Sequence, residues 1–293
     1  MKMLPLNRYT GHFFALPALA LIGIIAVFPI CYNLYLSLNT WFVASPKGPA
    51  WVGLANYVDL ISDPRFWNSL RVTLLFTIGA LGAQVFLGVL LALFFNRTFR
   101  GRAVVKTIFL LPIAATPVAV SLIWAMMYNY DLGVINVILR HLGLPPPLWL
   151  ASPETVIPAL IITDTWQWTP LVMLIVLASL ESLPQDPFES ARIDGANGLQ
   201  IVFHITLPLV KPAIVVAAML RSIDAIKTFD LIYVMTQGGP DIASENLNVY
   251  VFHKGFFYFK MGMASSMAVV LFTIVLVVNI LLAIFRKGEQ AYV

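Results

Sequence analysis

The stretch that decides the fold of this chain is ESARIDGANGLQIVFHITLP, residues 189–208. Its first half is polar, and the stretch lies between two apolar runs of membrane-spanning length. A membrane protein has no structural need for so specific a loop. The stretch therefore predicts a docking surface for another protein, set between two transmembrane helices.

The composition indicates a membrane protein. Hydrophobic residues make up 60% of the 293 residues and charged residues 11%, with a mean hydropathy of +0.87, whereas soluble domains carry about 25% charged residues. Crossing a bilayer takes about 20 apolar residues. Four charge-free runs satisfy this length and two more contain embedded charges, so we expect six spans: residues 13–38, 72–95, 107–130, 155–180, 213–234 and 261–285.

The first run is too long for the apolar core of a secretory signal, which has about 7–15 residues, so we expect a retained helix. Cys31 is the single cysteine, which excludes a disulfide within the chain.

The loop at residues 96–106 orients the chain. It carries Arg97, Arg100, Arg102 and Lys106 and no acidic residue, and short basic loops stay in the cytoplasm. With six spans, both termini and the segment 181–208 are then expected in the cytoplasm as well.

Further motifs accompany the 189–208 stretch: WVGLANY at residues 51–57, DPRFW at 63–67 and TQGGP at 236–240. The stretch itself resembles the EAA signature (Glu-Ala-Ala, three residues, Gly, nine residues, Ile-x-Leu-Pro) of permease subunits in binding-protein-dependent ABC importers. Ser190 at the first Ala is the one departure. The other motifs resemble the carbohydrate branch of these permeases, of the maltose and glycerol-phosphate kind.

The resemblance implies an all-α, six-span permease of the type I ABC importer architecture, with residues 1–293 forming one transmembrane domain in a bacterial inner membrane. It implies a second, related permease chain, two cytoplasmic ATPase subunits that hold ATP and Mg, and an extracytoplasmic solute-binding protein. The chain itself is then expected to be no enzyme and to bind no cofactor, metal or nucleic acid, with membrane lipid around it.

The coupling loop, about residues 181–208, is expected to hold a short helix over 186–198 that seats in an ATPase. Asp186 before Pro187 indicates an N-cap, and Glu189 completes a capping box. Gly195 and Gly198 can end the helix through positive φ angles. The residues expected to couple are Glu189, Ala191, Asp194, Gly195, Leu207 and Pro208.

The fifth span carries four ionisable residues spaced three apart with alternating sign: Arg221, Asp224, Lys227 and Asp230. Such residues are neighbours on a helix surface. Charges inside a span face a bundle interior or a watery cavity and indicate function. The set either forms an internal ion-pair ladder or lines a solute path, where a carboxylate beside a cation suits sugar hydroxyls.

The fourth span carries Asp164, Trp166, Gln167 and Trp168, about 15 Å from its outer end at 1.5 Å per residue. Tryptophans of the interfacial belt do not lie so deep. They either pack between helices or bind sugar rings, with Asp164 and Gln167 bonding hydroxyls. Antiparallel packing would bring this group to the depth of Asp224–Asp230, so both groups are predicted to bind solute.

Other residues are expected to have structural roles. Pro112 and Pro117 are expected to kink the third span, Gly79 and Gly82 to allow close helix packing, and Tyr128 to anchor the chain at the membrane interface. The four histidines lack metal-ligand spacing, and no P-loop motif occurs. The alternative class is an ion-coupled secondary transporter with Asp224 and Asp230 as relay carboxylates. It leaves the coupling loop unexplained. The sequence leaves open whether the solute is neutral, phosphorylated or sulfonated.

Overall fold

The computed structural model describes residues 8–290, with side chains from 15 to 284, so Lys2 lies outside the described part. In the described part of the chain, the regular elements are helices, apart from one short two-stranded sheet. The elements follow in this order: α1 Arg8–Ser37, β1 Asn39–Thr40, β2 Ala50–Trp51, α2 Ala55–Ser62, α3 Pro64–Phe95, α4 Arg102–Ala114, α5 Pro117–Met127, α6 Val134–His141, α7 Val156–Glu181, α8 Asp186–Ile193, α9 Gly198–Ile201, the π-helical turn η1 Val202–Thr206, α10 Leu207–Ile226, α11 Asp230–Thr236, α12 Leu247–Phe252, the π-helical turn η2 His253–Phe257 and α13 Met261–Gln290.

Five described segments are long and apolar enough to cross a membrane: Ala15–Ser37, Pro64–Phe95, Val156–Glu181, Gly198–Ile226 and Met261–Ile284. The pair α4 and α5 makes a sixth span if it is counted as one, although the two helices meet at 99°. The all-α fold with six expected spans is thus confirmed, with the third span broken.

The break in the third span follows from proline chemistry. Thr116 precedes Pro117 and takes an extended conformation, φ −68° and ψ 142°, because a proline ring disfavours helical geometry in the residue before it. The Thr116 hydroxyl then caps α5 by accepting from the Ala119 N–H at 3.4 Å. The predicted kink is confirmed.

The contacts divide the chain into two compact units, residues 1–63 with 251–270 and residues 64–250 with 271–293. A single domain over 1–293 stays a prediction. In the first unit, β1 and β2 pair antiparallel. The Asn56 side-chain amide donates to the backbone oxygens of Ser37 and Asn39, both at 2.9 Å, which fixes α2 beside the end of α1.

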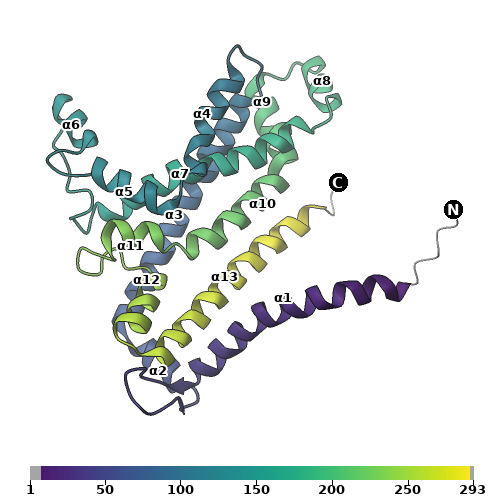
Figure 1. The fold of residues 1–293 in the computed structure, drawn as a ribbon. Coiled ribbons are helices and arrows are strands. Elements are labelled where there is room, and N and C mark those ends of the chain that lie inside the picture. Colours follow the sequence, from purple (N-terminus) through teal and green to yellow (C-terminus); the bar gives the residue numbers. More distant parts are fainter. Residues whose placement is uncertain (1–7, 291–293) are drawn as a thin grey trace. The chain divides into compact units, whose positions relative to one another are not determined.

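In the second unit, α3 packs along α7, and α10 lies against both (Figure 1). The helices approach closely at Gly79, where a Cβ atom would lie 2.6 Å from Ile161 Cδ1. Gly79 therefore serves close packing as predicted. A Cβ atom on Gly82 would meet no described atom within 4 Å, so the same prediction is wrong there.

Tyr128 is not an interfacial anchor. It is 4% exposed in an apolar core formed by α3, α5, α7 and α11, and its hydroxyl donates to Ala159 O at 3.1 Å. The prediction is wrong because the bend after α4 brings the end of α5 against α7.

The fifth span ends earlier than predicted. α10 ends at Ile226, and Asp230 begins the separate helix α11. The backbone carbonyl groups just past this helix end accept hydrogen bonds from two side-chain amides. Asn246 Nδ2 donates to Thr228 O at 2.5 Å, and Asn248 Nδ2 donates to Lys227 O at 2.6 Å. Helix ends need such partners, and here they come from a segment about twenty residues further along the chain.

Candidate functional site

A buried polar cluster joins the three central helices of the second unit. Asp164 on α7 accepts through Oδ2 from Arg221 Nη2 on α10 at 2.9 Å and from Gln84 Nε2 on α3 at 2.6 Å. Gln84 Oε1 accepts in turn from Arg221 Nε at 2.9 Å. All three residues are at most 2% exposed, so each buried charge is paired and hydrogen-bonded.

Gln84 is not among the residues that the sequence pattern predicts to bind solute. The signal was available, since Gln84 is a lone amide in the otherwise apolar second half of α3. Polar residues in a span face the protein interior and pair there. Its partners lie 80 and 137 positions away, which no local pattern reveals.

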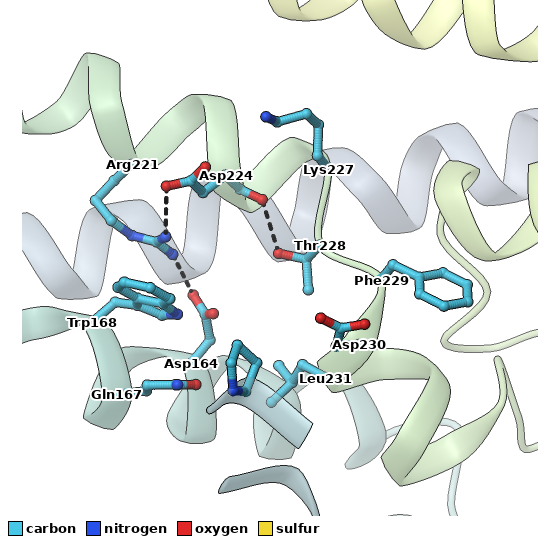
Figure 2. A pocket seen from close by; sticks show the side chains of 11 residues that line it. Asp164, Gln167, Trp168, Arg221, Asp224, Lys227, Thr228, Phe229, Asp230 and Leu231 are labelled. Carbon is cyan, nitrogen blue, oxygen red and sulfur yellow. Dashed lines mark hydrogen bonds and ion pairs between the residues drawn. The ribbon is translucent and has the colours of Figure 1, made fainter. Parts of the chain in front are cut away.

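Beside this cluster lies a cavity of ≈ 370 Å³, within the size range of small-molecule sites. Arg221 lies over the Trp168 ring, with Cζ 4.8 Å from the ring centroid, and its Nη1 is 3.8 Å from Asp224 Oδ2. Figure 2 shows these groups around the cavity, which is lined by Pro117, Asp164, Gln167, Trp168, Arg221, Asp224, Lys227, Thr228, Phe229, Asp230 and Leu231.

The cavity brings together most of the residues predicted to bind solute. Six of them line it: Asp164, Gln167, Trp168, Asp224, Lys227 and Asp230. Their roles in binding stay predictions, and the geometry separates them. Asp164 already accepts hydrogen bonds from its buried partners Arg221 and Gln84. Gln167 Nε2 already donates to Ala115 O at 3.2 Å, at the break between α4 and α5. Trp168, Asp224 and Asp230 remain as the groups best placed for a solute.

Trp166 lies elsewhere. Its side chain lines a separate apolar groove of ≈ 950 Å³ between α3, α4, α5 and α7. Its ring meets the Trp124 ring edge-on, with centroids 5.7 Å apart. The prediction that Trp166 and Trp168 face one site is wrong, because residues two apart on a helix point in different directions.

The structure excludes one of the two alternatives for the charged set, a four-residue ion-pair ladder on a single helix. Arg221 and Asp224 are an i, i+3 pair on α10, but Lys227 follows the end of that helix and Asp230 lies in the first turn of α11. The regular spacing gave no sign of the helix end. The chain turn instead places Asp230 on another wall of the same cavity.

The helix predicted over residues 186–198 begins where expected but ends sooner, as α8 over Asp186–Ile193, and its role in coupling stays a prediction. It projects from one end of the second unit near α9 (Figure 1). Gly195 has φ +80°. The Gly195 N–H donates a hydrogen bond to Arg192 O at 3.1 Å, and the Ala196 N–H donates one to Ala191 O at 2.9 Å. This is a Schellman ending, so the predicted role of Gly195 in ending the helix is confirmed.

The start of α8 differs from the prediction. Asp186 is the first helical residue, and no side-chain hydrogen bond caps the helix at Gln185, so the capping box with Glu189 is wrong. A capping box forms instead at α9, between Asn197 and Gln200. Gly198 opens α9 and is absent from the positive-φ residues of the described chain, so its predicted role as a helix end is also wrong.

The surface of α8 and α9 is exposed. Glu189 and Asp194 are open to solvent, Ala191 and Leu207 are half-buried, and Pro208 is exposed. Two apolar side chains missed by the sequence analysis stand out, Ile193 at 86% and Leu199 at 71% exposure. Apolar residues inside a polar loop were the available signal, since exposed apolar patches mark interaction sites.

Among the described residues, no group of three or more His, Cys, Asp or Glu side chains is placed to hold a metal ion.

Comparisons with known proteins agree with this architecture. Residues 84–289 match the family described as "Binding-protein-dependent transport system inner membrane component". The trehalose/maltose transport system permease protein MalF of Thermococcus litoralis is 36% identical over 280 residues, covering 95% of this chain and 93% of that protein. The sulfoquinovosyl glycerol transport system permease protein SmoG of Agrobacterium fabrum is 34% identical over 274 residues, covering 93% and 89%.

Among solved structures, a chain of a bacterial ABC transporter involved in the import of alginate superposes with a TM-score of 0.82. The match covers 96% of each chain at 23% identity, and it supports the fold alone. The resemblance carried by residues 189–208 is thereby confirmed: this chain belongs to the family of binding-protein-dependent transport system inner membrane components, the permeases of ABC importers.

Proposed function

We propose that this chain is a permease subunit of an ATP-driven importer for a sugar or sugar-like solute, delivered by an extracytoplasmic binding protein. The observation that carries the proposal is that α7 and α10 line the polar cavity and are joined through the exposed helix α8. Relatives named for trehalose/maltose and sulfoquinovosyl glycerol support the solute class. Neither family nor relatives favour the ion-coupled alternative.

The partners follow from the same proposal. A second, related permease would complete the translocation path, and two ATPase subunits would hold ATP and Mg and perform hydrolysis. They would dock on α8 and the Gly195 turn, with Glu189, Ala191, Asp194, Leu207 and Pro208 around them. Both chain termini would lie in the cytoplasm.

The proposed mechanism uses the connection between the docking surface and the cavity. Asp164 and Trp168 lie on α7, and Arg221 and Asp224 lie on α10. The only segments between these helices are α8, α9, η1 and their short links. Movement of α8 by a closing ATPase pair would therefore reach both walls of the cavity at once. Such a switch between inward- and outward-facing states is a rigid-body transition.

Recognition would rest on Trp168, Asp224 and Asp230. The apolar face of a pyranose ring can pack on the Trp168 ring, and hydroxyl groups can donate to the two carboxylates, which accept only. Small-molecule sites use precisely placed polar groups of this kind to orient a ligand.

A substitution pair tests the coupling part of the proposal. Gly195→Asp adds a charged side chain where a Cβ atom meets no described atom within 4 Å, so the bundle itself has room for it. We expect loss of uptake and of binding-protein-stimulated ATP hydrolysis, with membrane insertion retained.

The matched control is Gly143→Asp. Gly143 has φ +71°, meets no described atom within 4 Å, and follows α6 in the same type of helix ending. The strain of placing Asp at positive φ is thus shared by both variants, whereas the docking surface is altered only in Gly195→Asp. Normal uptake in Gly195→Asp would reject the coupling role.

A further inference from the structure

We propose that the cavity selects a neutral, polyhydroxylated solute and disfavours anionic sugars, because the guanidinium at its wall is committed to the protein. This inference rests on the proposed import function and narrows the solute class. Family membership does not decide the matter, since relatives are named for trehalose/maltose and for a sulfoquinovosyl compound, and the sulfoquinovosyl group is a sulfonate.

Two of the three Arg221 side-chain nitrogens donate hydrogen bonds, and the third faces a carboxylate beyond hydrogen-bond distance. Nε donates to Gln84 and Nη2 to Asp164, both at 2.9 Å, and Nη1 faces Asp224 at 3.8 Å. The Trp168 ring covers the guanidinium, and the residue is 1% exposed. A sulfonate or carboxylate on a solute would have to displace Asp224 to reach Nη1. To reach Nη2 it would have to displace Asp164, which would leave a buried carboxylate without its cation.

The remaining charges favour hydroxyl donors over anions. Asp164, Asp224 and Asp230 oppose Arg221 and Lys227 in the lining, so the formal charge is two positive less three negative, or −1. With the Arg221–Asp164 pair internally neutral, the solute meets two carboxylates and one ammonium. The Asp224 side chain is 53% exposed, and Figure 2 shows the Lys227 side chain extending away from the Trp168 ring and Asp164.

A neutral sugar and an anionic sugar are expected to depend on different charged residues of the cavity. A neutral sugar donates hydroxyl hydrogens to Asp224 and Asp230, and nothing in it needs an ammonium group. An anionic sugar is repelled by both carboxylates and depends on Lys227. The order in which Asp224→Asn and Lys227→Gln impair uptake therefore identifies the class of solute.

The test uses the complete importer, reconstituted with its partners. Uptake is measured with labelled trehalose and maltose as neutral probes, and with glucuronate and sulfoquinovose as anionic ones. We expect neutral sugars to enter faster. We expect Asp224→Asn to reduce their uptake by about tenfold or more, as loss of a charged hydrogen bond does. Lys227→Gln should cost about threefold or less, as for an exposed charge.

The binding protein and ATPases are the same in every comparison, so the rank order of the variants reports this cavity alone. Lys47→Gln, an exposed lysine outside the cavity, is the matched control and should transport as the unchanged protein does. Co-purification with the partners checks that each variant assembles.

Uptake of the anionic probes with the reverse order of variants would overturn the inference and leave the import function standing. Entry of anionic probes at the rate of neutral ones would overturn it too. If the unchanged importer moved neither kind of sugar, the proposed function would itself be rejected, and the inference with it.

Discussion

At the scale of single residues, substitutions in the buried cluster of Gln84, Asp164 and Arg221 are expected to lower the stability of the fold strongly. Removing one member of a buried ion pair costs about 3–5 kcal/mol because a charge is left uncompensated. Gln84 is uncharged, but it bonds both ionic partners and so fixes their geometry across α3, α7 and α10. We regard it as a structural residue whose position holds the wall of the cavity.

Two neighbouring tryptophans on α7 provide a matched pair. Trp168 lines the cavity under Arg221, whereas Trp166 lines the apolar groove beside Trp124. We expect Trp168→Ala to lower sugar uptake at least about tenfold, since aromatic contacts carry much of the energy in binding sites. Trp166→Ala should retain uptake. Equal loss in both variants, with poor assembly, would indicate that the two rings act in packing alone.

At the scale of elements, the short helices show where side-chain caps matter. α9 has only four residues, Gly198–Ile201, and the capping box of Asn197 and Gln200 holds its first turn. α8 begins without any such bond and relies on its Schellman ending.

A local unfolding measurement separates these two cases. Asn197→Ala removes a cap worth about 0.5–2 kcal/mol. We therefore expect hydrogen exchange of the α9 amides to accelerate by roughly twofold to thirtyfold, at 1.4 kcal/mol per factor of ten. Asp186→Ala removes no cap and should leave exchange at the start of α8 near its original rate. Protection lost equally in both variants would contradict this assignment.

Sequence patterns revealed the elements better than their ends. Long apolar runs located the spans because membrane length is a strong constraint, and the prolines at 112 and 117 located the break. The end of α10 could not be predicted from the sequence, because Asn246 and Asn248 stabilise it through hydrogen bonds that exist only in the folded chain. The position of Trp166 in the apolar groove could not be predicted either, because the depth of a residue along a helix does not determine which face its side chain occupies.

At the scale of the whole molecule, orientation in the membrane is the property that decides function. Under the proposed function, the basic loop at residues 96–106 and α8 must lie on the same side of the membrane so that ATPases can dock on α8. Both are expected in the cytoplasm by the excess of Arg and Lys in that loop.

Cysteine labelling of intact cells checks this orientation. With Cys31→Ser as background, a membrane-impermeant thiol reagent should modify Lys47→Cys and Asp241→Cys from outside. It should miss Thr98→Cys and Gln200→Cys until the cells are opened. External labelling at position 200 would overturn both the topology and the docking of ATPases on α8.

The broken third span depends on the helices around it for its place in a bilayer. α4 has 13 residues and α5 has 11, which at 1.5 Å per residue gives about 20 and 16 Å, so neither alone crosses a hydrocarbon core of about 30 Å. The extended backbone at Thr116 needs protein or water around it at that depth, and Pro117 beside it lines the cavity. Neither half of this span can hold its depth in a bilayer by its own length, so α4 depends on α7, and α5 on α11 and α7, which pack against them.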